Sequence, residues 1–538
     1  MQNPAKAGSA PGVGASPQSL VTVREAVLQL LRAFRMTTIF GNPGSTELPM
    51  FRDFPAEFRY VLGLQESLVV GMADGYAQAT RNAALVNLHS AAGVGHAMGN
   101  IFTAFKNQTP LVITAGQQAR SILPFEPFLF SARASELPQP YVKWSCEPAR
   151  AEDVPAALAR AYYVAMQPPR GPTFVSVPVD DWDRLCEPVE PRQVSELLRG
   201  DPALLETVAR ELAAAERPAF VVGAGVARDD AWDEVIALAE RHQAKVWVAP
   251  LAARNAFPED HRLFAGFLVA DRAKVVASLT GHDLVLVLGA PAFTYHVEGV
   301  GPHVPPGTKL FQLVDDPGVA AWTPVGMSVV TSLRPAIREL LAGPAPRPRA
   351  APGKMARPPR VSGAALDGSY LCQQLAALRP RDSIIVEEAP TTRGPMHDYL
   401  PILARDTFYT CASGGLGYGL PAAIGVALAR RNEKVIALLG DGASMYAIQG
   451  LWTAAQLKLP ITFIIVNNRR YEALVQFAQH FGLPRTVGTT LADIDFCGLA
   501  LSQGCKAVRV DRAEGLDAAL RGALAAAEPT LVEAVVES

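Results

Sequence analysis

The sequence lacks the features that mark secreted, zinc-binding and membrane-spanning proteins. Its 6 cysteines are scattered without a CxxC pair, a spacing that fits a reducing cytosol and neither a disulfide framework nor a zinc knuckle. No apolar run approaches the roughly 18 to 20 residues that cross a bilayer. Residues 1–19 contain no apolar core that a signal peptide would need. We therefore expect a cytoplasmic protein with a disordered leader over residues 1–19 and no membrane as partner.

The chain also lacks an excess of charge of either sign. Its 49 Lys and Arg residues nearly balance its 51 Asp and Glu residues, which leaves a net charge of -2. This balance gives no electrostatic reason to expect nucleic acid as a partner, so small ligands are the better expectation. A content of 49% hydrophobic and 19% charged residues indicates a globular protein. Since 538 residues are too many for one core, about three domains are expected.

What the chain does contain is a regular alternation of strand-like apolar runs and helical stretches. This alternation predicts parallel sheets whose strands are joined by crossover helices. The predicted fold class is therefore α/β, with three doubly wound parallel-sheet domains. Proline-rich stretches interrupt the alternation near residue 190 and after residue 342, and the second favours an extended, solvated tether. The predicted boundaries are residues 20–190, 191–342 and 363–538 for the domains, with a linker at 343–362.

Strands are predicted where short runs of β-branched and other apolar residues occur. In the middle domain Gly223 and Gly225 begin a dinucleotide-binding pattern, but Arg228 stands at the place of its third glycine. We therefore interpret this turn as structural, without a bound NAD or FAD. The predicted strands are residues 38–40, 84–88, 111–115 and 173–177 in the first domain, 219–222, 245–248, 284–288 and 310–314 in the middle domain, and 383–386, 407–410, 435–439, 461–466, 506–510 and 531–535 in the third.

Two polar motifs follow neighbouring strands of the third domain. A Gly-Asp-Gly motif centred on Asp441 follows the run at 435–439, and an Asn-Asn pair ending at Asn468 follows the run at 461–466. Neighbouring parallel strands place both motifs at the carboxyl edge of one sheet. A carboxylate, a carboxamide and a carbonyl suit Mg²⁺, which prefers oxygen ligands and shares its shell with phosphates. The two motifs predict a diphosphate and metal site, whereas Gly-Asp-Gly alone would favour an ordinary turn.

Three side chains of the first domain stand where chemistry is expected. Ser45 lies at a loop-to-helix junction in a loop rich in glycine and proline, although a helix N-cap is an equal alternative. Glu66 lies between an apolar run and a helix of small residues, so its carboxylate is expected to be partly buried and to need a partner. His89 follows an apolar strand and can act near neutral pH, although helix capping or a core hydrogen bond is the favoured alternative for a lone histidine.

Other candidate features lie in the middle and third domains. A glycine-rich loop at residues 412–419 leads into a helix of small residues, which lets the backbone approach a flat ligand or lets helices pack closely. His296 follows a strand of the middle domain and means little by itself. Some residues could shape an aromatic substrate pocket, although buried aromatics more often belong to the core: Phe125, Phe128, Ala473 and Phe477.

Taken together, these motifs resemble those of a known family. The segments are FGNPGSTELP, LQES, NLHSAAG, TYH, GGLGYGLPAAIG, GDGASMY and NNRRY, in this order from about residue 21 to the C-terminus. The chain resembles the thiamine diphosphate-dependent 2-keto acid decarboxylases, and among them the benzoylformate decarboxylases. The resemblance implies a pyrimidine-binding domain, a Rossmann-like middle domain and a diphosphate-binding domain. It also implies a homotetramer in which each cofactor lies between two subunits.

The resemblance further implies roles for individual residues. Glu66 would contact the pyrimidine ring of the cofactor and activate it, and Ser45 would hold the substrate carboxylate. His89 and His296 would be the acid and base. The family usually has Asn-Asn-Gly-Thr-Tyr-Gly where this chain has arginines at 469 and 470 and Glu472, which bears on substrate size. Cofactor contacts are implied for Gly414, Leu416, Gly442, Ala443, Ser444 and Tyr471, and Mg²⁺ binding for the side chains of Asp441 and Asn468 and the carbonyl of Arg470.

The implied reaction is the non-oxidative decarboxylation of an aromatic 2-keto acid, benzoylformate to benzaldehyde and carbon dioxide, with carboligation as a side activity. Two alternatives stay open at this point. One is an acetolactate synthase-like carboligase with the same cofactor. The other is a non-catalytic oligomer that retains the cofactor while the loop from Arg469 to Glu472 blocks the substrate. The two histidines favour decarboxylation with protonation.

Overall fold

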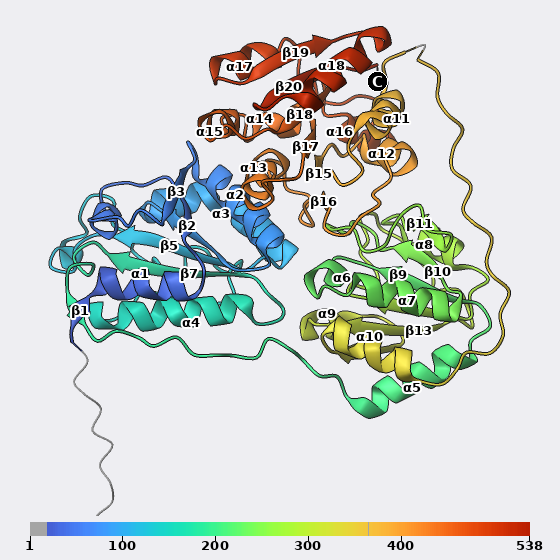
Figure 1. Cartoon of the computed structure of the whole chain (residues 1–538), viewed down its shortest axis with the longest axis horizontal. Coiled ribbons are helices and arrows are strands. Elements are labelled where there is room, and N and C mark those ends of the chain that lie inside the picture. The colour runs from blue at the N-terminus through green and yellow to red at the C-terminus, as the bar shows by residue number, and fades with distance from the viewer. Residues whose placement is uncertain (1–18, 364, 538) are drawn as a thin grey trace, which may run out of the picture.

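The computed structural model describes residues 19–363 and 365–537, which form three α/β domains (Figure 1). The leader predicted for residues 1–19 falls outside the described residues, except for its last one. Each domain is built on a six-stranded sheet in which every paired strand is parallel to its neighbour. The predicted fold class is therefore confirmed. No helix in these described ranges is both long and apolar enough to cross a membrane.

The sheet of the first domain has the strand order β3-β2-β4-β5-β7-β6. The direction in which successive strands are added to the sheet therefore reverses between β2 and β4, although the strands themselves stay parallel. Alternate residues of the buried strands enter two cores: Val86 packs with the α2 and α3 side, and Leu85 with the α1 and α4 side. The elements are β1 (Val21–Thr22), α1 (Val23–Ala33), β2 (Thr38–Gly41), η1 (Leu48–Phe51), β3 (Arg59–Leu62), α2 (Glu66–Thr80), β4 (Ala84–Leu88), α3 (Ser90–Asn107), β5 (Leu111–Gln117), η2 (Leu123–Phe125), β6 (Ser145–Cys146), η3 (Ala151–Asp153), α4 (Val154–Met166), β7 (Pro172–Pro178) and β8 (Leu185–Cys186).

The sheet of the middle domain has the order β11-β10-β9-β12-β13-β14, which is the strand order of the Rossmann fold. A Cβ added to Gly225 would lie 2.6 Å from the Cα of Gly289, so the backbone of this glycine turn packs closely against the residue that follows β12. The contact supports the interpretation of the turn as structural. The elements are α5 (Pro202–Ala214), β9 (Pro218–Val222), α6 (Gly225–Arg228), α7 (Trp232–His242), β10 (Lys245–Val248), β11 (Phe264–Phe267), α8 (Arg272–Leu279), β12 (Leu284–Leu288), β13 (Lys309–Val314), α9 (Pro317–Trp322), β14 (Met327–Val330) and α10 (Leu333–Ala342).

The third domain repeats the topology of the first. Its order is β16-β15-β17-β18-β20-β19, with the reversal between β15 and β17. Ligands of such sheets bind outside the carboxyl ends of the strands at this reversal. The elements are α11 (Gly368–Leu378), β15 (Ile384–Glu388), α12 (Arg393–Tyr399), β16 (Phe408–Tyr409), α13 (Gly419–Ala429), β17 (Val435–Gly440), α14 (Asp441–Met445), α15 (Gly450–Gln456), β18 (Thr462–Asn467), α16 (Glu472–His480), α17 (Phe496–Ser502), β19 (Lys506–Val510), α18 (Ala513–Ala525) and β20 (Thr530–Val535).

Every predicted strand corresponds to a strand of the structure, but six strands were missed: β1, β3, β6, β8, β11 and β14. β1 and β8 pair with each other in a separate two-stranded sheet, and the other four lie at the edges of the first and middle six-stranded sheets. An edge strand pairs on one side only and is short here, so it carries no long apolar run. The sequence pattern therefore marks the centre of each sheet and misses the edges of the first two, whereas the edge strands β16 and β19 of the third sheet were predicted.

The segment between α10 and α11, for which the sequence favoured an extended, solvated tether, is anchored to the middle domain. The Arg349 guanidinium donates to the carbonyl oxygens of Leu212 at 2.6 Å, His242 at 2.8 Å and Ala215 at 2.9 Å. These carbonyls lie at or beside the ends of α5 and α7, where backbone acceptors lack helical partners. The arginines of this segment thus serve as anchors.

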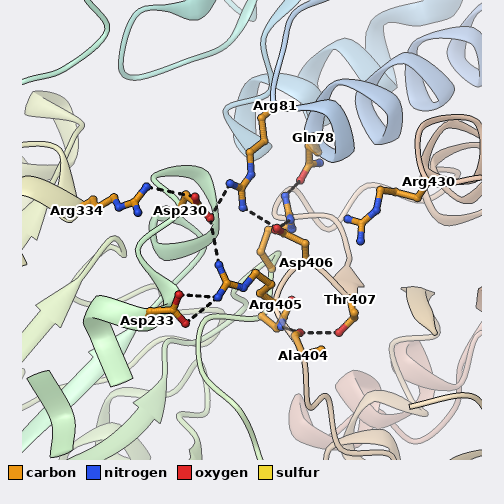
Figure 2. A network of polar contacts seen from close by, with 12 residues as sticks. Gln78, Arg81, Asp230, Asp233, Arg334, Ala404, Arg405, Asp406, Thr407 and Arg430 are labelled. Atoms are coloured by element: carbon orange, nitrogen blue, oxygen red, sulfur yellow. Dashed lines mark hydrogen bonds and ion pairs between the residues drawn. The ribbon is translucent and has the colours of Figure 1, made fainter. Parts of the chain in front are cut away.

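A cluster of ion pairs joins the three domains within one chain (Figure 2). Asp406 of the third domain accepts from Arg81 at the end of α2 and from Arg254 of the middle domain, each at 2.6 Å. Arg81 also pairs with Asp230 of the middle domain at 2.8 Å. Arg254 is 4% exposed, and its guanidinium lies 4.1 Å from the centroid of the Tyr409 ring. We call Arg81, Arg254, Asp230 and Asp406 the domain joint.

Candidate active site

A loop after β2 and the end of β4 bring together the first-domain candidates. His89 caps the start of α3, and its Nδ1 lies 2.9 Å from Oε2 of Glu47 and 3.1 Å from Oγ1 of Thr46. A Cβ on Gly44 would lie 2.2 Å from that same nitrogen, so the imidazole packs directly on the loop. His89 is therefore held by a carboxylate and is not a simple core histidine.

The Glu47 carboxylate is buried and fully used as an acceptor. It is 2% exposed and accepts from the backbone N–H of Gly44 at 2.8 Å and of Gly116 at 2.9 Å, and from the Thr46 hydroxyl at 2.7 Å. With this oxygen cluster facing Nδ1 of His89, the proton of the neutral ring resides on Nδ1 and leaves Nε2 free. Sequence reasoning missed Glu47, because its pairing with His89 depends on the adjacency of β2 and β4.

Ser45 lies in the same loop and is exposed. Its side chain makes no hydrogen bond to another described residue, so its hydroxyl is free to contact a ligand. The alternative of an N-cap is not supported, because the following 3-10 helix η1 has Glu47 at its N-cap position.

Glu66 is the first residue of α2 and has the partner that its burial requires. It is 9% exposed, and its carboxylate accepts from Asn42 Nδ2 at 3.2 Å and lies 3.1 Å from His96 Nδ1. Asn42 belongs to the loop that carries Ser45, so this hydrogen bond ties the Glu66 carboxylate to the Ser45 loop. The three first-domain candidates thus share one edge of the sheet, at the strand reversal.

The third-domain candidates gather at the carboxyl ends of β17 and β18. Asp441 is 5% exposed, and its Oδ1 accepts from Gly442 N–H at 2.7 Å while Oδ2 lies 3.3 Å from the Arg470 N–H. Asn468 Oδ1 lies 3.2 Å from the same N–H. A Cβ on Gly442 would lie 2.2 Å from the Tyr471 ring, so the tyrosine lies against this glycine. The structure therefore brings together Asp441, Gly442, Asn468, Arg470 and Tyr471.

This group suits a hard cation. Burial raises the pKa of Asp441 against the opposing effect of backbone N–H donors, and a cation would relieve the cost of burying its charge. The Arg470 carbonyl accepts a hydrogen bond from the Glu472 N–H at 2.9 Å, which leaves the second lone pair of this oxygen for a cation. An Asp, an Asn and a carbonyl offer the oxygen ligands that Mg²⁺ prefers. Across the residues that the structure describes, no group of three or more His, Cys, Asp or Glu side chains could hold a metal.

Two residues assigned to the diphosphate lie in the short helix α14. Ala443 is 5% exposed and Ser444 is 1% exposed. The Ser444 hydroxyl donates to the Gly440 carbonyl at 2.7 Å, so its proton is already engaged. A contact of the Ser444 hydroxyl with phosphate would therefore require its proton to leave the Gly440 carbonyl.

The loop with Gly414 and Leu416 is held from below by a buried carboxylate that the sequence did not reveal. Glu388, at the end of β15, accepts from the N–H of Gly417 at 2.6 Å and of Gly419 at 2.7 Å. Burial raises the pKa of Glu388 to about 8. Gly414 has φ +72°, and no atom lies within 4 Å of a Cβ built on it, so its backbone faces open space. That open face is what a flat ligand needs.

His296 reaches the third domain. Its N–H donates to the Ala270 carbonyl at 2.8 Å, and its ring centroid lies 4.8 Å from that of Phe477 on α16. Phe477 follows the Tyr471 segment by less than two helical turns. By contrast, Phe125 and Phe128 of the first domain are 79% and 87% exposed, so they are not core residues.

The candidates thus form two groups in one chain. We call Ser45, Glu47, Glu66 and His89 the first half-site, and Asp441, Gly442, Asn468, Arg470, Tyr471 and His296 the second half-site. Within residues 19–363 and 365–537, no hydrogen bond or ion pair connects the two half-sites.

Family models match all three domains. The N-terminal binding domain of the thiamine pyrophosphate enzymes matches residues 21–133, their central domain matches residues 205–340, and their C-terminal binding domain matches residues 391–534. These matches agree with the assignment of the first and third domains to cofactor binding.

Individual relatives are similar over nearly the whole chain. A benzoylformate decarboxylase from Pseudomonas aeruginosa is 42% identical over 518 residues, which are 95% of this chain and 98% of the relative. The crystal structure of benzoylformate decarboxylase from Polynucleobacter necessarius superposes with a TM-score of 0.94 at 40% identity, covering 96% of this chain and 98% of that one. A thiamine diphosphate-dependent 4-hydroxybenzoylformate decarboxylase from Rhodococcus jostii gives 0.93 at 40% identity, covering 96% and 99%.

Proposed function

The chain belongs to the thiamine pyrophosphate enzymes, and from that premise we propose that it decarboxylates an aromatic 2-keto acid such as benzoylformate to the aldehyde and carbon dioxide. The observation that carries the proposal is the pair of histidines, His89 and His296, on two half-sites of a chain 42% identical to a benzoylformate decarboxylase. Decarboxylation must end in protonation of the carbon that lost carbon dioxide, so acid groups beside the substrate are required. This requirement distinguishes the proposal from carboligation, which consumes a second keto acid instead.

The residues of the two half-sites can divide the work. The free hydroxyl of Ser45 is placed to hold the substrate carboxylate, and the Nε2 of His89 is free because Glu47 engages Nδ1. The ring of His296 lies against Phe477, whose apolar face suits an aryl group. An aryl ring beside one histidine and a carboxylate beside the other would orient the keto carbon between them.

Thiamine diphosphate with Mg²⁺, when bound, would supply the nucleophilic carbon and the electron sink for the reaction. Asp441, Asn468 and the Arg470 carbonyl would hold the metal, and the segment around Gly442 and Tyr471 the phosphates. Glu66 would hold a proton at the pyrimidine ring, as a buried carboxylate tied down by Asn42. The Arg470 guanidinium pairs with the Glu472 carboxylate, with Nε and Oε2 2.5 Å apart, so the charges of these two side chains cancel near the proposed metal site.

We also propose that a second copy of the chain completes each site, in a homotetramer. Among the described residues of one chain, Glu66 makes no hydrogen bond or ion pair with Gly414 or Leu416, yet the chemistry needs Glu66 beside the ring that this loop would hold. Exposed apolar residues near both half-sites support a partner: Leu48, Leu64, Phe128, Leu474 and Phe481.

The direct test is an assay of the purified chain with thiamine diphosphate, Mg²⁺ and benzoylformate, with benzaldehyde detected by chromatography. We expect benzaldehyde and carbon dioxide in equal amounts, and a rate that falls when EDTA removes the metal. Parallel reactions with 4-hydroxybenzoylformate and pyruvate would define the substrate. Acetolactate from pyruvate with no benzaldehyde from benzoylformate would contradict the proposal, as would cofactor binding without any turnover.

A further inference from the structure

A cavity of about 360 Å³ lies between the middle and third domains. Its walls come from the segments that follow β10 and β11 and from the start of α12, and no residue of either half-site is among them. Ala270 lines the cavity and also accepts the backbone N–H of His296, so the cavity lies behind the second half-site. A volume of this size falls within the range of small-molecule sites, which often occur between domains.

Polar side chains with unused hydrogen-bonding atoms line the cavity. Glu259 Oε2, Asn255 Oδ1 and Arg254 Nε are buried and have no hydrogen-bond partner in the described ranges. Their residues are 6%, 5% and 4% exposed. His397 Nδ1 is also buried and has no hydrogen-bond partner among the described residues. Buried polar atoms are normally paired, and each unpaired one costs about 1 to 3 kcal/mol, so a side chain of this group would gain by turning its unpaired atom toward a molecule in the cavity.

The charges around the cavity are already compensated. Arg254 donates to Asp406 at 2.6 Å, and Arg393 donates to Glu387 at 2.6 Å. Burial raises the pKa of Glu259 to about 8 and lowers the pKa of His397 to about 4, so both are neutral near pH 7. A charged ligand would lose its hydration without gaining a counter-ion here. The cavity therefore suits an uncharged molecule.

The remaining wall is apolar and partly aromatic. The rings of Phe267 and His397 stack with centroids 3.4 Å apart and an interplanar angle of 21°. Phe257, Met396 and Phe408 also line the cavity. Flat, wide side chains favour a planar ring as their ligand, while the few polar atoms fix its orientation.

We propose that this cavity is a second small-molecule site, which binds a neutral aromatic compound bearing a hydroxyl group. The ring would pack against the Phe267 and His397 pair, and the hydroxyl would satisfy Glu259 or Asn255. None of the residues to which the reaction is assigned lines this cavity, and the test measures binding alone, so failure of the decarboxylase assay would leave the proposal intact.

The test uses 2-naphthol as probe and equilibrium dialysis against the full chain loaded with thiamine diphosphate and Mg²⁺. A blocking variant is available, because a Cβ on Gly394 would meet nothing within 4 Å and would project from a residue that lines the cavity. Gly394→Leu should weaken 2-naphthol binding at least tenfold. Gly522→Leu is the matched control, since Gly522 also lies in a helix with nothing within 4 Å, and it should bind like the original chain.

A second variant tests the polar contact. Glu259→Met keeps the length of the side chain and removes its oxygen atoms. It should weaken 2-naphthol about 3- to 10-fold and leave naphthalene, which has no hydroxyl, unchanged. Absence of saturable 2-naphthol binding would overturn the proposal and mean that the cavity holds water only. Equal binding by Gly394→Leu and the original chain, or a co-crystal with the probe beside His296 and Phe477, would overturn it as well.

Discussion

The first and third domains share one strand order but use the same place in it differently. At the reversal of the first sheet, side chains predominate: Glu66 is tied to Asn42, and His89 to Glu47. At the reversal of the third sheet, backbone and small residues predominate, with Gly442 under Tyr471 and Gly414 open to solvent. The first arrangement suits proton exchange by side chains, and the second suits binding of a ligand by the backbone. The comparison predicts that variants of the first half-site lose turnover and that variants of the second, apart from His296, lose cofactor.

The largest effect is expected for Glu66→Gln. The amide keeps the shape of the side chain but cannot hold a proton as a carboxylate does. We therefore expect kcat to fall by up to 10⁴-fold, the upper end of the contribution of about 10² to 10⁴ that a proton-transferring group makes to a rate. Cofactor affinity and the unfolding temperature should change little. Steady-state kinetics with saturating cofactor measures kcat, and calorimetry measures the unfolding temperature. Glu57→Gln, at an exposed residue of the same domain paired with Arg32, is the matched control, and unchanged kcat in Glu66→Gln would remove the carboxylate from the reaction.

His89→Ala is expected to lower kcat about 10²- to 10³-fold, because the ring is the first-domain group placed to transfer a proton. The dissociation constant of the cofactor should stay within about twofold. Fluorescence titration of the cofactor alongside kinetics separates the two quantities. His261→Ala in the middle domain, whose ring pairs with Glu240 away from the site, should be silent. A variant that loses the cofactor yet turns over normally once saturated would reverse the assignment.

Gly442→Ala should produce the opposite pattern. The added methyl group would lie 2.2 Å from the Tyr471 ring, and such overpacking costs about 1 to 3 kcal/mol. We expect cofactor binding about 5- to 100-fold weaker with kcat nearly restored at saturation. Gly515→Ala, on α18 with its nearest neighbour 3.6 Å away, serves as the control. Normal cofactor binding with reduced kcat would break the proposed division between the half-sites.

The smallest of these effects is expected for Glu47→Gln. The residue acts on the substrate only through His89, so losing one charge-assisted hydrogen bond should lower kcat about tenfold. The amide can donate to Nδ1, which would move the ring proton to Nε2. Nitrogen NMR of labelled histidine reports this tautomer change, which a merely structural role would not produce. Glu47→Asp should recover part of the rate if the carboxylate positions the ring.

The sequence predicted that Asp441 and Asn468 lie together, but it did not predict the pairing of Glu47 with His89. Asp441 and Asn468 each follow directly on an apolar run, so strand adjacency alone brings them together. The pair of Glu47 and His89 joins residues 42 positions apart and depends on which strands are neighbours. The contact of His296 with Phe477 depends on how two domains are set against each other, which no local pattern encodes. The support of the Gly414 loop by Glu388 was hidden because a buried glutamate at a strand end has no pattern of its own.

The domain joint has a consequence for anyone who wishes to cut or recombine this protein. Arg254 is nearly inaccessible, and its counter-ion Asp406 comes from a domain that starts more than a hundred residues later. A fragment that stops after the middle domain would leave the Arg254 cation without its counter-ion. Removing one partner of a buried pair typically costs about 3 to 5 kcal/mol. Chimaeras that borrow a third domain from a relative should therefore carry an acid at the position of Asp406, or exchange both partners together.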